Sequence, residues 1–202
     1  MKVVLATRNE HKLRELRVLA APHEIVPLPE HVELPPETGD TFEENALGKA
    51  RAAAVATGLP AIADDSGIEA AALGGAPGVR SARFAGESAT DEENLAKLLR
   101  DVPAGGDRRV AYVCAIAHVD PAGVERVFEG RCEGTLAHEP RGSGGFGYDP
   151  AFVPADRDDG LTMAELPPDE KDAISHRGRA ARAWLEWLGA EVAAARAETE
   201  SG

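Results

Sequence analysis

Aromatic residues are scarce in this sequence. Only 4% of the 202 residues are Phe, Trp or Tyr, although 43% are hydrophobic. A chain of this length and hydrophobic content can bury a substantial core, so that core must be built from Ala, Val, Leu and Ile. Each aromatic side chain is therefore a feature to explain.

Cysteine and positive charge are also in short supply. Cys114 and Cys132 are the only cysteines, and their spacing is not that of a metal site. Both fall on predicted strands, which favours core packing in a reducing compartment. The chain has 22 Lys and Arg against 35 Asp and Glu, a net charge of −13. This charge argues against duplex DNA or an anionic membrane as the main partner.

Long apolar runs are absent as well. No run approaches the length of a membrane-spanning helix, and the chain starts with a strand pattern rather than a signal peptide. We expect a cytoplasmic protein that binds neither nucleic acid nor membrane. A small anionic ligand is still compatible with the charge, because a metal ion and a few local cations can outweigh the overall field.

Two adjacent carboxylates stand out in residues 61–67. Ala61, Ile62 and Ala63 lead directly into Asp64 and Asp65, and Ser66 and Gly67 follow. The pattern predicts a short buried strand that ends in a turn. Side chains alternate along a strand, so the two carboxylates should point in different directions. The pair suits Mg²⁺, which prefers oxygen ligands, but a capped turn is the commoner explanation of such a motif.

The N-terminal segment combines a strand, a polar turn and a helix. Residues 3–6 are apolar, residues 7–12 are polar, and a helical pattern follows. This order gathers free backbone N–H groups at a helix N-terminus, where an anion is stabilised. Lys12 would add a point charge one turn into the helix. An ordinary Thr or Asn N-cap with a solvated Lys12 explains the same residues.

A capping box precedes the next helix. Thr41 and Glu44 have the spacing of this motif, and they predict a helix that runs to about Thr57. Glu44 can be a capping residue or a metal ligand, and both roles compete for the same oxygens. Lys49, within the helix, could reach a phosphate or be solvated.

The segment 141–150 has four glycines around Phe146, followed by Tyr148 and Asp149. Glycine allows close approach of a backbone to a ligand, and Phe146 is a candidate platform for a flat ring. The alternative is a surface loop whose two aromatic residues fold back onto the sheet. Farther on, His176 and Arg177 begin a helix, where cations oppose the helix dipole. Something negative or electron-rich should compensate them.

Strands and helices alternate at first, and a hairpin follows. Residues 109–119 form a central strand pattern, and residues 124–132 return after a turn at residues 120–123. The fold class is therefore α/β with a mixed sheet.

Six motifs occur in order along the chain and together resemble one family, the non-canonical purine nucleoside triphosphate pyrophosphatases, or inosine/xanthosine triphosphatases. The resemblance covers residues 1–189. Arg8 and Arg80 depart from it, since many members carry a small residue and an aromatic there. The matching motifs are Thr7-x-Asn9-x-x-Lys12, Thr41-Phe42-x-Glu44-Asn45-Ala46, Ala63-Asp64-Asp65-Ser66-Gly67, Leu73-Gly74-Gly75-Ala76-Pro77-Gly78, Gly145-Phe146-Gly147-Tyr148-Asp149-Pro150 and Glu170-Lys171-x-x-Ile174-Ser175-His176-Arg177.

The resemblance implies an elongated mixed sheet flanked by helices, with two lobes and a nucleotide cleft between them. Residues 1–189 would form this single domain, and residues 190–202 a frayed polar tail. It also implies a homodimer that needs Mg²⁺ and hydrolyses dITP, ITP and XTP to the monophosphate and pyrophosphate.

Residue roles follow from the resemblance. Asp65 would activate the water that attacks the α-phosphorus, Glu44 and Asp65 would hold the metal, and Asp64 would support them. The implied substrate contacts are Thr7, Arg8, Asn9, Glu10, His11, Lys12, Lys49, Ser66, Phe146, Gly147, Tyr148, Asp149, Lys171, His176 and Arg177.

Two other hypotheses fit parts of the sequence. One is a Maf-type pyrophosphatase with a different base specificity, which matches the segments around Phe146 and His176 less well. The other is a catalytically silent nucleotide sensor, against which the intact Glu44, Asp64 and Asp65 argue.

Overall fold

A single mixed sheet forms the centre of the molecule. The computed structural model describes the backbone of residues 1–200 and the side chains of residues 1–193. The sheet has six strands in the order β2-β1-β3-β4-β5-β6. β1 pairs in parallel with β2 and β3, whereas the other pairs are antiparallel. The strands are β1 (Lys2–Leu5), β2 (Glu24–Pro27), β3 (Ala61–Ala70), β4 (Arg109–Val119), β5 (Glu125–Leu136) and β6 (Phe152–Pro154).

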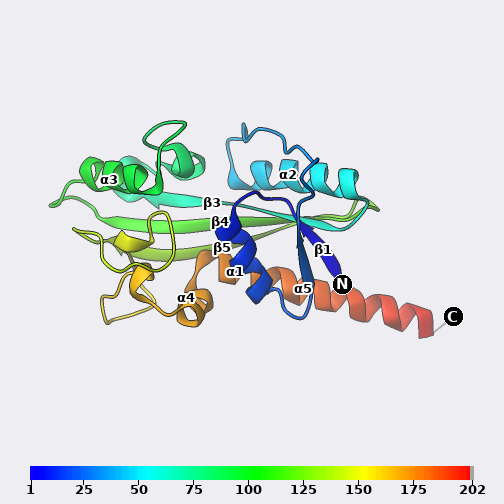
Figure 1. The fold of residues 1–202 in the computed structure, drawn as a ribbon. Helices are drawn as coiled ribbons and strands as arrows, with labels where there is room; N and C mark the ends of the chain where they lie inside the picture. Colours follow the sequence, from blue (N-terminus) through cyan, green and yellow to red (C-terminus); the bar gives the residue numbers. More distant parts are fainter. Residues whose placement is uncertain (201–202) are drawn as a thin grey trace.

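Helices cover both faces of this sheet. In Figure 1, α2 and α3 lie on one side of the long strands, and α1, α4 and α5 lie on the other. The predicted α/β class is therefore confirmed. The α-helices are α1 (Glu10–Leu19), α2 (Phe42–Thr57), α3 (Asp91–Asp101), α4 (Pro168–Ile174) and α5 (His176–Glu200), and the 3₁₀ turns are η1 (Ala71–Leu73), η2 (Gly78–Arg83), η3 (Asp149–Ala151) and η4 (Met163–Glu165).

Local capping sets the bounds of α2. The Thr41 hydroxyl accepts a hydrogen bond from the Glu44 backbone N–H, and the Glu44 carboxylate accepts from the Thr41 N–H. At the other end, Gly58 adopts the left-handed conformation with φ of 64°, which glycine reaches without steric cost. The predicted helix is confirmed at both ends.

The strand that carries the two carboxylates is longer than predicted. We expected it to end in a turn at Ser66 and Gly67, but β3 continues to Ala70 and pairs with β4 throughout. That expectation was wrong because Gly67 serves close packing rather than a turn. A Cβ at Gly67 would lie 2.4 Å from the Ser81 Oγ and 2.5 Å from the Gly78 carbonyl oxygen.

The apolar core is divided along β3. Buried residues before Asp64, such as Ile62 and Ala63, join the clusters packed under α1, α2 and α5. Buried residues after Gly67, starting with Ile68, join a cluster with α3 and β6. Residues 64–67 belong to none of these clusters. The core thus forms two lobes, one around the buried residues before Asp64 and one around those after Gly67, and the polar site lies where they meet.

Two further features concern the cysteines and the C-terminus. Cys114 and Cys132 are buried and unpaired, as core packing predicts. α5 continues to Glu200, where we expected a frayed tail from residue 190, and residues 201–202 lie outside the described part. Among the described residues, no helix combines the length and the apolar character needed to cross a membrane.

Candidate active site

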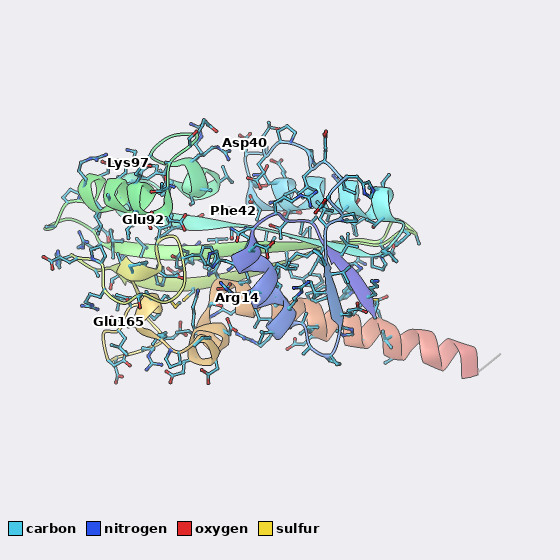
Figure 2. The ribbon with its side chains drawn as sticks, in the orientation of Figure 1. Arg14, Asp40, Phe42, Glu92, Lys97 and Glu165 are labelled. Carbon is cyan, nitrogen blue, oxygen red and sulfur yellow. The ribbon has the colours of Figure 1, made fainter. Side chains whose placement is uncertain are left out.

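A cavity of about 340 Å³ opens at the junction of the lobes. Its walls include Lys49 of α2 and Lys12 of α1, and these helices lie on opposite sides of the sheet. In Figure 2, the labels Asp40, just ahead of α2, and Arg14, on α1, mark these two sides. Most of the predicted site residues share it. The predicted residues among its walls are Thr7, Arg8, Asn9, Lys12, Lys49, Asp65, Ser66, Phe146, Gly147, Tyr148, Asp149, Lys171, His176 and Arg177.

The polar turn after β1 forms one end of the cavity. Asn9 caps α1, since its Oδ1 accepts hydrogen bonds from the backbone N–H groups of His11 and Lys12 at 2.9 and 3.1 Å. The N-cap part of that explanation is thus correct, but its solvated Lys12 is wrong, because the Lys12 side chain is only 15% exposed. Lys12 reaches across and pairs with the Asp64 carboxylate. Glu10 and His11 are exposed and are not among the cavity walls.

Asp64 and Asp65 point in different directions, as strand alternation predicts. Asp65 contacts α2: its Oδ2 accepts from the Asn45 Nδ2 at 3.1 Å, and its Oδ1 lies 3.3 Å from the Lys49 Nζ. Asp65 is a wall of the cavity, whereas Asp64 is not. Burial raises the pKa of Asp65; Lys49 opposes this effect and the nearby Glu37 carboxylate adds to it.

Asp64 is fixed by cations on the other face of β3. Its Oδ2 accepts from the Arg177 Nε at 2.9 Å and from the Cys114 Sγ at 3.0 Å. Burial alone would raise the pKa of Asp64, but Arg177 and Lys12 outweigh it and hold the pKa well below its ordinary value. Asp64 therefore stays ionised, and it binds Lys12 and Arg177 on the face of β3 opposite Asp65.

Phe146 is another wall of the cavity. The Lys171 Nζ lies 5.3 Å and the Arg177 Cζ 5.6 Å from the centroid of its ring, and the His11 ring stacks on it at 5.1 Å. Tyr148, in contrast, is buried and donates its hydroxyl to the Ser81 carbonyl oxygen at 2.7 Å. Tyr148 thus folds back, as the alternative predicts for both aromatic residues, whereas Phe146 lines the cavity.

Asp149 holds this loop in place. Its Oδ2 accepts from the Phe146 backbone N–H at 2.9 Å and from the Lys171 Nζ at 2.8 Å. Its Oδ1 accepts from the Tyr112 hydroxyl at 3.1 Å. The position of the Phe146 ring is therefore determined by a buried carboxylate with three donors.

His176 and Arg177 have the compensation that their place at a helix start requires. Arg177 donates to Asp64, to the Ser66 Oγ at 3.0 Å and to the Glu15 Oε2 at 2.6 Å. His176 stacks on Tyr112 at 4.5 Å. Burial, followed by the Arg177 charge, holds the pKa of His176 well below its ordinary value. Its Nδ1 is buried and has no hydrogen-bond partner among the described residues.

Comparisons with known proteins decide the family. The sequence profile of the Ham1 family matches residues 3–187. The chain belongs to the Ham1 family. It is 54% identical over 193 residues to a dITP/XTP pyrophosphatase of Symbiobacterium thermophilum, which covers 93% of this chain and 94% of that relative. It is 56% identical over 197 residues to a dITP/XTP pyrophosphatase of Frankia alni, with 90% and 94% covered.

Solved Ham1 structures share the fold. The Staphylococcus aureus Ham1 protein superposes with a TM-score of 0.84 at 39% identity, covering 95% of this chain and 100% of that one. The Coxiella burnetii Ham1 protein gives a TM-score of 0.83 at 43% identity, covering 94% and 98%. The resemblance seen in the sequence motifs is therefore confirmed.

Acidic residues of this Ham1 site escaped the sequence reasoning, among them Asp91, a cavity wall that accepts from the Gly147 backbone N–H at 2.9 Å. Two others are glutamates. Glu37 lies in a proline-rich loop without a recognisable motif, yet it is a wall of the cavity, and its Oε1 accepts from the Lys49 Nζ at 2.6 Å. Glu15 lies within the helical pattern of α1 and bridges Lys171 and Arg177. Burial would raise the pKa of Glu15, but these two cations lower it overall. Nothing local in the sequence marks either residue.

Glu44 has a different position from the one expected of a metal ligand. It is exposed and is not among the cavity walls. Its Oε2 accepts hydrogen bonds from the backbone N–H groups of Asp40 and Thr41 at 2.8 and 3.3 Å. Within the described residues, no three His, Cys, Asp or Glu side chains are grouped closely enough to bind a metal by themselves. Mg²⁺ does not need such a group, because it usually takes one or two carboxylates together with substrate phosphates.

Proposed function

We propose that this chain hydrolyses dITP, ITP and XTP to the nucleoside monophosphate and pyrophosphate. The observation that supports this most strongly is the shared cavity, whose walls include Lys12, Lys49 and Asp65 together with Phe146 and Arg177. The Ham1-family relatives that carry the name dITP/XTP pyrophosphatase support the same activity.

The triphosphate would lie along the turn after β1. The Thr7 and Asn9 side chains can contact its oxygens, and the N-terminus of α1 stabilises negative charge. Lys12 and Lys49 would supply the two cations. Both now face carboxylates of β3, so phosphate binding would replace one anionic partner by another.

We propose Glu37 and Asp65, rather than Glu44, as the carboxylates that hold Mg²⁺. Both line the cavity and both contact the Lys49 Nζ, at 2.6 and 3.3 Å. Hard carboxylate oxygens open to a phosphate-binding cavity suit this ion. When bound, a divalent cation offsets the charge that develops on the phosphate oxygens.

Glutamine variants of Glu37 and Glu44 test which of the two glutamates binds the metal. Glu37→Gln is expected to raise the Mg²⁺ concentration for half-maximal activity by about tenfold or more, because a metal-site carboxylate is lost. Glu44→Gln should leave this concentration close to that of the wild type, since Gln also completes a capping box. The opposite ranking of the two variants would return the metal role to Glu44.

Asp65 would accept the proton of the attacking water. Asn45 and Lys49 orient its carboxylate for this role through contacts at 3.1 and 3.3 Å. The O–H bond breaks as the water oxygen attacks the α-phosphorus in line, and the bond to the bridging oxygen breaks as pyrophosphate leaves. Asp64 would hold the strand in place, and Ser66 would contact the substrate.

Base selection would depend on hydrogen-bond donors beside Phe146. Hypoxanthine and xanthine carry an acceptor at the 6-oxo position, where adenine carries an amino donor. Lys171, Arg177 and His176 can offer donors to that oxygen, and adenine would leave these donors unpaired. A site of this type discriminates by about 10⁴–10⁵ against the analogue that lacks the group.

The product and the site of attack test the reaction class. With Mg²⁺ and dITP in H₂¹⁸O, we expect pyrophosphate as the first product and ¹⁸O in the monophosphate. Orthophosphate as the first product, or ¹⁸O in the pyrophosphate, would exclude attack at the α-phosphorus. Nucleotide binding without turnover would favour the silent sensor instead.

The proposal includes the assembly and the compartment. We propose a homodimer that acts in the cytoplasm on free nucleotides. Sedimentation of the purified chain should give twice the monomer mass of 21.2 kDa, and a monomer at micromolar concentration would contradict it.

A further inference from the structure

Arg8 departs from the family pattern, and its side chain makes contacts that the reaction described above does not use. The guanidinium donates to four backbone carbonyl oxygens of one loop. Nη1 donates to Leu28 at 2.9 Å, and Nη2 donates to Pro29, Glu30 and Val32 at 2.9, 3.2 and 2.7 Å. Part of Arg8 lines the cavity, but the hydrogen bonds that its Nη1 and Nη2 make with described residues all go to this loop.

The loop needs donors from outside. Residues 27–36 contain four prolines, and proline has no backbone N–H. Between residues 28 and 38 the segment supplies few backbone hydrogen bonds of its own, from Val32 to Pro29 and from Thr38 to Pro36. Arg8 therefore supplies donors that the segment lacks, while Leu28 and Val32 anchor it through burial.

The same loop delivers two residues to the cavity. Leu34 and Glu37 are both cavity walls, and Glu37 lies five residues after Val32, the last carbonyl that Arg8 binds. Glu37 in turn holds Lys49, which contacts Asp65. A continuous set of contacts thus runs from the turn after β1 to the catalytic strand.

We infer that Arg8 is a positioning residue that fixes the segment 28–37 and thereby keeps Glu37 in the cavity. Arg8 contributes donors in a planar arrangement rather than a charge for phosphate. This inference rests on the proposed function only in so far as Glu37 is assigned to the metal.

The Arg8→Lys substitution distinguishes a phosphate contact of Arg8 from a contact that fixes the loop. Lysine keeps the positive charge but has a single nitrogen with three donors, so it cannot reproduce the planar set of contacts. A phosphate contact would be rescued to a large extent by Arg8→Lys. A loop-fixing contact would not be.

Hydrogen–deuterium exchange of the chain without nucleotide tests the inference independently of activity. In Arg8→Ala and, to a smaller extent, in Arg8→Lys, amides of residues 28–41 should exchange about tenfold faster, because local opening is easier. Amides of β4 and β5 should be unchanged. Arg51→Ala is the control, since Arg51 also makes two side-chain hydrogen bonds, to Glu125 on the surface, and its loss should leave residues 28–41 unaffected.

Mg²⁺ titration supplies the second measurement. Arg8→Lys should require about tenfold more Mg²⁺ for half-maximal activity, with a smaller change in kcat. Wild-type exchange over residues 28–41 in both Arg8 variants, or full recovery of the Mg²⁺ requirement by Arg8→Lys, would overturn the inference. If the wild type released no pyrophosphate, the proposed function would fail, while faster exchange in the variants would still support the loop-fixing role.

Discussion

Asp64 and Asp65 are neighbours in the chain, yet they face opposite sides of β3 and have different partners. Arg177 and Lys12 hold Asp64 in its ionised form, whereas Asp65 has a raised pKa and faces the cavity. Under the proposed function, these different surroundings would give two identical residues a supporting and a reacting role.

Replacing Asp65 with Asn tests this division at the scale of one residue. We expect kcat for dITP to fall by about 10²–10⁴, because a positioned proton acceptor contributes that much. The dissociation constant of the nucleotide, measured by calorimetry, should change little, since Asn has nearly the same shape. An Asp65→Asn variant with more than a tenth of the wild-type kcat would contradict the assignment.

His176 predicts a pH dependence of stability. Its pKa is lowered by burial, so the folded protein keeps it neutral while the unfolded chain takes up a proton near a pKa of about 6.5. The contribution is therefore complete above that value and declines as the pH falls through it. The decline is at most about 1.4 kcal/mol per pH unit for one histidine.

Urea unfolding at pH 7.5 and 5.5 measures this effect. His176→Gln should lose less stability between the two pH values than the wild type does. His118, whose pKa burial also lowers, contributes in the same direction to both proteins and cancels in the comparison. An identical pH slope for wild type and variant would show that His176 does not titrate as described.

At the scale of elements, β3 depends on its contact with η2. Gly67→Ala would place a methyl group within 2.5 Å of backbone and side-chain oxygens, and overpacking of this kind costs about 1–3 kcal/mol. Gly189→Ala in α5 is the matched control, because nothing lies within 4 Å of the added Cβ. Thermal unfolding should rank Gly67→Ala well below the wild type and Gly189→Ala at or above it. Equal melting temperatures would contradict the close packing.

Glu15 connects α1 to the segment where α4 ends and α5 begins. Its two carboxylate oxygens bind Lys171 and Arg177, so Glu15→Gln leaves two buried cations with less compensation. We expect the free energy of unfolding to fall by about 3 kcal/mol. Glu125→Gln, which breaks the exposed pair with Arg51, should cost at most about 1 kcal/mol. Similar losses for both variants would remove the special role of Glu15.

At the scale of the whole molecule, local features were the ones that the sequence could predict. The capping box at Thr41 fixes where α2 begins, because its hydrogen bonds span only three residues. The strand end at Gly67 could not be predicted in the same way. β3 continues there because η2 packs on Gly67, a contact between segments that the sequence pattern does not reveal.

The site shows the same division. The residues on recognisable motifs, such as Lys12, Asp65, Phe146 and Arg177, do share one cavity. Glu37 was missed because its loop is held at the cavity by residues distant in the sequence, including Arg8, Lys49 and Arg83. Glu44 attracted attention because its local motif is strong, and that motif is also what occupies its carboxylate.

The central claim is that one cavity binds both the phosphates and the 6-oxo purine base of a nucleotide. Parallel measurement of kcat/KM for dITP, XTP, dGTP, dATP and dTTP with Mg²⁺ tests it most directly. The donors beside Phe146 predict values for dITP and XTP that exceed the value for dATP, whose base lacks the 6-oxo acceptor, by about 10⁴. Comparable values for dITP and dATP, or a preference for dTTP, would contradict it.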